Sequence, residues 1–160
     1  MLNLFLPARD STSSATGFIL FHLARHPDVW IKLREEVISI DDAPITFGLP
    51  KSMKYLKFLV NENLAPAVLS IQTRVEDCVL LRGGGPDGKS PILVRPGTEI
   101  RIFFHALHRD RGIWREYAMG FRPERWENLR KTWEYIPFLG GGGICPAQQM
   151  ALTEVSYLVV

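Results

Sequence analysis

Apolar and polar residues follow two different periods along the chain. Val29, Leu33 and Val37 recur every four positions, as in a helix that buries one face. Phe18, Phe21 and Leu23, in contrast, suggest a first helix that is buried on more than one face. Farther along the chain, short apolar runs separated by glycine and proline indicate strands and turns. The predicted helices cover residues 3–26, 29–38, 51–64 and 146–160. The predicted strands cover residues 68–75, 77–81, 92–94 and 98–104. We therefore expect a mainly α fold with small β-sheet elements.

Glycine and proline set several of the predicted boundaries. Pro27 stands where the first helix should stop, and Asp28 is expected to cap the second helix. Residues 83–88 read Gly-Gly-Gly-Pro-Asp-Gly and separate two strands. A glycine triplet ahead of a lysine also occurs in phosphate-binding loops, but the helix start that such a loop needs is not predicted here. We predict a turn.

Composition and charge place the chain among ordinary globular domains. Of its 160 residues, 46% are hydrophobic and 22% are charged, which argues against a disordered chain. The net charge of +2 is too small, and its lysines and arginines too dispersed, to indicate a nucleic-acid partner. The longest apolar run, residues 15–23, is too short to span a bilayer, and residues 1–8 lack the basic start of a signal peptide. We expect no membrane span and no anchor in this chain.

The two cysteines have different surroundings. Cys78 lies in an alternating segment and is expected to pack in the core. Cys145 follows four glycines, residues 140–143, and precedes Pro146, which suits the first turn of a helix. Glycines allow close approach to a flat partner, and the N–H groups of a helix start stabilise a thiolate. Such a thiolate is a metal ligand or a nucleophile. The simpler alternative is a buried hydrophobic cysteine beside a flexible turn.

The spacing Phe-x-x-Gly-x-x-x-Cys-x-x-x-x-x-Ala over residues 138–151 resembles the haem-binding loop of the cytochrome P-450 monooxygenases. This resemblance implies haem b (iron protoporphyrin IX) with Cys145 as thiolate ligand of the iron, and with Phe138 and Gly141 at the cofactor. Residues 23–30 and 121–126 are similar to further family segments, in the same order. The resemblance covers nearly the whole chain and implies a single partial domain, residues 1–160, that corresponds to the C-terminal part of the cytochrome P-450 fold.

Two further sites follow from the same resemblance. Asp10 and Ser11 match the acid and the alcohol of the family's oxygen-binding segment, with Thr12 as a substitute hydroxyl. A hydroxyl beside a carboxylate can relay the protons that dioxygen cleavage requires. Taken alone, these residues are more often a helix cap or a solvated face. Arg74 falls where the family often places a basic residue against a haem propionate, and a surface arginine on a strand edge is an equal alternative.

The chain departs from the family pattern at three positions. Glu62 lacks the arginine of the Glu-x-x-Arg motif, and a buried carboxylate without its partner is costly. We expect either that Glu62 moves to solvent or that the local fold differs, and a direct Glu62–Arg125 pair is the remnant to look for. Gly143 stands where a basic residue is usual, and Ala147 replaces a glycine.

The resemblance implies insertion of one oxygen atom of O2 into an apolar substrate. The sequence is similar to those of fungal members that hydroxylate alkanes and fatty acids, so an alkane or a fatty acid is the implied substrate. It also implies an NADPH-dependent reductase as electron donor and a place on the endoplasmic reticulum membrane, facing the cytosol. The absent N-terminal portion and the departures lead us to expect a truncated or degenerate member. The alternative is a non-catalytic remnant that binds haem weakly or acts only as an interaction fragment. Exposed apolar patches along the first and last helices would favour that alternative.

Overall fold

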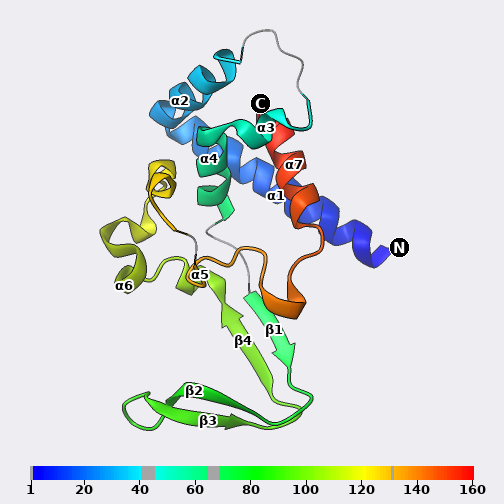
Figure 1. Cartoon of the computed structure of the whole chain (residues 1–160), viewed down its shortest axis with the longest axis vertical. Coiled ribbons are helices and arrows are strands. Elements are labelled where there is room, and N and C mark those ends of the chain that lie inside the picture. The colour runs from blue at the N-terminus through cyan, green and yellow to red at the C-terminus, as the bar shows by residue number, and fades with distance from the viewer. Residues whose placement is uncertain (1, 41–45, 65–68, 131) are drawn as a thin grey trace.

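A computed structural model of the chain describes residues 2–40, 46–64, 69–130 and 132–160 (Figure 1). Figure 1 shows the longer helices gathered at one end of the molecule and two small β-sheets at the other. The mainly α fold with small sheets is thereby confirmed. In chain order the elements are α1 (Leu2–Arg25), α2 (Pro27–Ile38), α3 (Leu49–Ser52), α4 (Lys54–Leu64), β1 (Leu69–Thr73), β2 (Cys78–Gly84), β3 (Ser90–Val94), β4 (Glu99–Phe103), α5 (Phe104–Leu107), α6 (Arg111–Trp114), the 3-10 helices η1 (Arg115–Met119), η2 (Pro123–Glu127) and η3 (Gly141–Gly143), and α7 (Gln148–Val159).

The larger hydrophobic core lies among α1, α2, α4 and α7. Helix α1 packs against the other three, and α4 also contacts α2 and α7. Each buried Leu, Ile or Val of this core contributes about 1.5–3 kcal/mol relative to an exposed position. No helix in the described part of the chain is long and apolar enough to cross a membrane. The buried members of this core are Ile19, Leu23, Val29, Leu33, Met53, Leu56, Leu59, Val60 and Val155.

Two predicted boundaries are wrong at the start of α2. The helix begins at Pro27 rather than at residue 29, because proline is well placed at the first helical position, where its missing N–H costs nothing. Asp28 does not cap the helix. It lies in the first turn, and the preceding residue, His26, makes no side-chain capping bond.

The single helix predicted over residues 51–64 is also wrong, because Met53 interrupts it. This residue has an extended backbone and a buried side chain, so that α3 ends before it and α4 begins after it. The new helix start is stabilised by Glu36 of α2, whose carboxylate accepts hydrogen bonds from the backbone N–H groups of Tyr55 (2.8 Å) and Leu56 (2.9 Å). A negative charge at this helix end also interacts favourably with the helix dipole.

The four strands form two antiparallel pairs. β1 pairs with β4, with Ile71 opposite Arg101, and β2 pairs with β3 across a bulge. The turn between β2 and β3 lies in the predicted segment, residues 83–88, but starts at Gly85 because Gly83 and Gly84 belong to β2, and the N–H of Gly83 donates to the carbonyl of Gly88 (2.8 Å). Residues 83–90, Gly-Gly-Gly-Pro-Asp-Gly-Lys-Ser, have the spacing of a phosphate-binding loop. A strand follows them instead of the helix that such a loop needs. The expectation that Cys78 packs in the core is wrong, since it begins β2 and is only half-buried.

A second, aromatic core lies beside α4. Trp114, Trp126 and Tyr135 pack together, with a distance of 4.4 Å between the ring centroids of Trp126 and Tyr135. Their polar atoms are paired: the indole of Trp114 donates to the carbonyl of Leu107 (3.0 Å), and the hydroxyl of Tyr135 donates to the carbonyl of Asn61 (2.8 Å). Burial raises the pKa of the Tyr135 phenol, so it remains a donor. This core is therefore attached to the helical core through α4.

The carboxylate of Glu62 forms the strongest link between the two cores. Its Oε1 accepts a hydrogen bond from the backbone N–H of Arg122 (2.8 Å), and its Oε2 accepts one from the indole of Trp126 (2.7 Å). The Nε of Arg125 lies 3.1 Å from Oε2, and Glu62 is only 5% exposed. The expected Glu62–Arg125 pair is confirmed. The expectation that Glu62 would turn to solvent is wrong, because the N–H of Arg122 and the indole of Trp126 bind the buried carboxylate in addition to Arg125.

Arg125 is held as firmly as its partner. Its Nη2 donates to the carbonyls of Tyr117 and Gly120, at 2.6 Å each, and its side chain is largely buried. Burial raises the pKa of the Glu62 carboxyl, while the N–H of Arg122, the charge of Arg125 and the indole of Trp126 act in the opposite direction. Both charges thus depend on one another, and removing either one leaves a desolvated charge or unpaired donors.

We predict that Glu62→Met lowers the free energy of unfolding by about 3–5 kcal/mol, because a buried guanidinium and two N–H donors lose their acceptor. The matched control is Glu127→Met, which removes the exposed Lys54–Glu127 pair (2.7 Å) and should cost about 1 kcal/mol or less. Urea unfolding of both variants measures the two losses. Equal losses would show that the Glu62 carboxylate does not hold the cores together.

Candidate functional site

The segment around Cys145 folds into a closed loop. The backbone N–H of Cys145 donates to the carbonyl of Phe138 (2.9 Å), and that of Ile144 donates to the carbonyl of Gly141 (3.3 Å). The 3-10 helix η3 lies between these two bonds. The backbones of Phe138 and Cys145 are therefore adjacent, and the half-buried thiol stands at the end of a glycine turn.

Glycine is required at two points of this loop for different reasons. Gly141 has a φ of 63°, a left-handed conformation that costs other residues energy. At Gly140 a Cβ would lie 2.5 Å from the ring of Trp133, which covers the backbone there. At Gly142 and Gly143 no atom lies within 4 Å of the point where a Cβ would stand, so this side of the loop is open to a flat partner.

The helix after the loop starts later than predicted. α7 begins at Gln148, not at Pro146, because residues 146–147 form a turn in which the N–H of Gln148 donates to the carbonyl of Cys145 (3.3 Å). Cys145 thus precedes the helix by three residues. Ala147 occupies the N-cap position and makes no side-chain capping bond. The carbonyl of Cys145, rather than its thiol, is directed to the helix start by this bond.

The three polar residues predicted on α1 lie on two faces. Asp10 and Ser11 are exposed, whereas Thr12 is 8% exposed and faces the same side as the core residue Ile19. The carboxylate of Asp10 lies 3.7 Å from Nε of Arg9, in an exposed pair that contributes little to stability. The structure therefore separates the two hydroxyls: Ser11 shares the solvent-facing side with the acid, and Thr12 does not.

Arg74 follows β1 and is half-buried, with its Nε lacking a hydrogen-bond partner within the described residues. Its backbone N–H donates to the carbonyl of Thr98 (3.0 Å), and its carbonyl accepts from the N–H of Gly97 (2.8 Å). These two bonds hold the residue at the junction of the two strand pairs. Both interpretations of Arg74, a propionate partner and a surface arginine on a strand edge, stay predictions in this environment.

The Cys145 loop and the Asp10 segment are connected by helix packing rather than by hydrogen bonds between side chains. α1, which carries Asp10, packs against α7, which follows Cys145. Within the described residues, no hydrogen bond or ion pair joins the side chains of Asp10, Arg74 and Cys145. The described part also holds no cluster of three or more His, Cys, Asp or Glu side chains for a metal ion.

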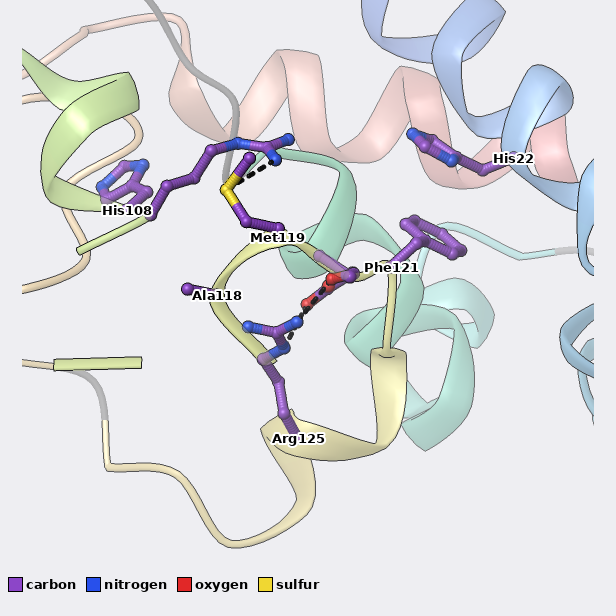
Figure 2. Close-up of a pocket in the computed structure, with 9 residues that line it drawn as sticks. His22, His108, Ala118, Met119, Phe121 and Arg125 are labelled. Atoms are coloured by element: carbon purple, nitrogen blue, oxygen red, sulfur yellow. Dashed lines mark hydrogen bonds and ion pairs between the residues drawn. The ribbon is translucent and has the colours of Figure 1, made fainter. Parts of the chain in front are cut away.

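A small pocket lies between α1 and the loop that contains Phe121 (Figure 2). Its volume of about 50 Å³ is far below the 300–1,000 Å³ of ordinary ligand pockets. A second, more open cavity of about 380 Å³ lies against α7. Cys145 lines neither cavity. The small pocket is lined by His22, Glu62, His108, Arg109, Ala118, Met119, Gly120, Phe121 and Arg125.

Sequence reasoning identified Glu62 and Arg125 but missed the other polar and aromatic groups of this pocket, among them His22, Arg109 and Phe121. The ring of His22 stacks on Phe121, with 4.1 Å between centroids and 3° between planes. Burial lowers the pKa of His22, and the nearby charges of His26, Arg109 and Arg25 lower it further. The signal in the sequence was the four-residue spacing of His22 and His26, which places His26 one turn after His22, just beyond the end of α1.

We predict opposite effects for two neighbouring glycines of the loop. Gly141→Ala should lower the free energy of unfolding by about 1 kcal/mol, because alanine is strained at positive φ. Gly142→Ala, at an open position without positive φ, should raise it by a few tenths of a kcal/mol by restricting the unfolded chain. Urea unfolding measures both changes. Equal effects would mean that the loop does not have the described conformation.

Comparison with known proteins identifies the family of the chain. The family model described as Cytochrome P-450 matches residues 1–160. The chain is 44% identical over 159 residues to cytochrome P-450 monooxygenase apdE of Emericella nidulans, and 45% identical over 159 residues to cytochrome P-450 monooxygenase fumoA of Cordyceps fumosorosea. Each of these alignments covers 98% of this chain and 31% of the relative.

A third relative gives the same result. Cytochrome P-450 52-M1 of Starmerella bombicola is 42% identical over 170 residues, which cover 100% of this chain and 32% of the relative. The chain therefore spans about a third of the length of the relatives it matches. Since the family model matches over the whole of its length, the chain belongs to the cytochrome P-450 family.

Proposed function

We propose that this chain forms the haem-thiolate part of a monooxygenase, with Cys145 as the ligand of haem b. The observation that carries the proposal is the closed glycine loop, in which the N–H of Cys145 is bonded to the carbonyl of Phe138. This bond fixes the cysteine backbone, while the unhindered backbone at Gly142 and Gly143 leaves room for a planar group. A soft thiolate on such a loop suits haem iron.

Arg74 also fits a haem group. The unpartnered Nε of Arg74 is a half-buried cationic donor, and a propionate carboxylate is the kind of acceptor that would satisfy it. Exposed Gly143 supplies no charge at the position where a basic residue is usual, so Arg74 would carry more of the propionate binding in this chain. We propose that Phe138 and Gly141 border the cofactor beside Cys145.

The proposed role of α1 is proton delivery. Bound haem would supply the oxidative chemistry, which the protein side chains do not perform themselves. Asp10 is solvent-exposed and can take protons from water, and Ser11, next to it on the exposed side, can pass them on through its hydroxyl. We assign the relay to Asp10 and Ser11 and not to Thr12, because Thr12 faces the core.

The proposed substrate is an apolar small molecule, such as an alkane or a fatty acid, together with O2. The monooxygenase names of the relatives support the reaction class. An NADPH-dependent reductase would supply electrons at the endoplasmic reticulum membrane, as the family resemblance implies. We further propose that residues 1–160 form a single partial domain of the family fold.

A specific observation favours the alternative, a non-catalytic remnant that acts as an interaction fragment. Phe18 and Phe21 on α1 are 61% and 53% exposed, and Leu158 on α7 is 65% exposed. Large apolar side chains grouped on two packed helices are typical of surfaces that another protein segment covers. Weak haem binding without thiolate ligation would be the property of such a fragment.

We predict that the haem-reconstituted protein, reduced and exposed to carbon monoxide, has a red-shifted Soret band that depends on Cys145. The Cys145→Ala variant should lose this band, whereas Cys78→Ala, which removes the other free cysteine, should keep it. An absorption spectrum of the unchanged chain and of each variant shows whether the red-shifted band is present. No haem uptake, or a band that survives Cys145→Ala, would refute thiolate ligation and favour the remnant.

We also predict that Arg74→Gln weakens haem affinity roughly tenfold, because a hydrogen bond to a charged group contributes about 1.5–3 kcal/mol. Arg82→Gln, at an exposed position on β2, should leave the affinity unchanged. Haem titration followed by Soret absorbance gives both dissociation constants. Equal affinities for the two variants would remove Arg74 from the proposed cofactor site.

A further inference from the structure

The small pocket of Figure 2 contains donors that have no adequate acceptor. The Nδ1 of His22 is buried and makes no hydrogen bond within the described part of the chain, although its ring is fixed by stacking on Phe121. The hydrogen bond of Arg109 goes from Nη1 to the sulfur of Met119, at 3.9 Å, and a thioether is a weak acceptor.

The charges around the pocket do not cancel. Arg109 and Arg125 contribute two positive charges, and Glu62 contributes the one carboxylate of the lining. That carboxylate is already engaged by Arg125, by the indole of Trp126 and by a backbone N–H. Among the described residues, no carboxylate lies within ion-pair distance of Arg109. Arg109 therefore makes no direct ion pair among them, and the charge of Glu62 acts on it only from a greater distance.

The size of the pocket restricts what could neutralise this charge. A volume of about 50 Å³ holds a few water molecules or one small ion, but no organic substrate. The attraction between a guanidinium and an anion is much stronger at such a partly desolvated position than in water. A neutral His22 that carries its proton on Nδ1 would add a second donor from the opposite wall.

We propose that this pocket is a binding site for a small monovalent anion, such as chloride, held between the guanidinium of Arg109 and the imidazole of His22. The site is separate from the Cys145 loop and does not depend on haem. The anion would neutralise the charge excess beside Glu62 and Arg125, and so would stabilise the contact between the two cores. Arg109 and His22 come from segments that are 87 positions apart, residues 22 and 109, so a bound anion would join them.

The first test is thermal unfolding of the 160-residue chain at constant ionic strength, with chloride replaced stepwise by gluconate, which is too large for the pocket. At a chloride concentration ten times its Kd, the midpoint should be about 3–5 °C higher than in gluconate, and the effect should saturate. Arg109→Gln should abolish this dependence. Arg111→Gln, at an exposed neighbouring position, should retain it.

The second test observes His22 directly and needs no variant. The charged or titratable groups near its ring are Arg25 at the end of α1, His26 directly after it, and Glu62, His108, Arg109 and Arg125 in the pocket lining. A bound anion offsets the positive ones, so chloride should raise the pKa of His22 in a nuclear magnetic resonance titration, and gluconate should not. If chloride and gluconate act alike in both experiments, the pocket holds water only and the proposal is wrong.

Discussion

The burial of the Glu62 carboxylate is the constraint on which the two halves of the structure depend. A desolvated carboxylate is tolerated only where donors surround it, and here the donors come from a backbone N–H, an indole and a guanidinium on the segment 122–126. The helix that carries Glu62 belongs to the helical core, and Trp126 belongs to the aromatic core. A single charge therefore fixes how the two hydrophobic clusters meet, which apolar contacts alone would leave adjustable.

The position of the cysteine loop depends on the contact between the helical core and the aromatic core. Tyr135 packs on Trp126 and donates its hydroxyl proton to the carbonyl of Asn61, so the chain leaves the aromatic core at a fixed point. One residue later, the N–H of Ile136 donates to Nε2 of the buried His108 (3.0 Å). The loop then closes by the bond between Cys145 and Phe138. This series of contacts fixes the backbone of Cys145, and a fixed backbone would lower the entropic cost of the proposed ligation.

Local patterns predicted the elements well and the long-range contacts poorly. The 3.6-residue period placed α1 to within one residue of Leu2–Arg25, and glycines and prolines placed the β2–β3 turn. The break at Met53 was missed because the carboxylate that stabilises the new helix start, Glu36, is 19 and 20 positions away from its partners. The donors that bind the Glu62 carboxylate were missed for the same reason, because Arg122 and Trp126 lie 60 and 64 positions away from it along the chain. Family resemblance supplied the Glu62–Arg125 pair but not the pocket beside it.

The central claim is that a loop positioned in this way supplies a sulfur ligand to haem iron. X-ray absorption at the iron edge of the haem-reconstituted chain tests it most directly, because the first coordination shell distinguishes sulfur from nitrogen and oxygen. The account predicts one sulfur scatterer beside the four porphyrin nitrogens, and its loss in a chain without the Cys145 thiol. A first shell of nitrogen and oxygen alone would contradict the account, because this chain would then bind haem without a thiolate ligand.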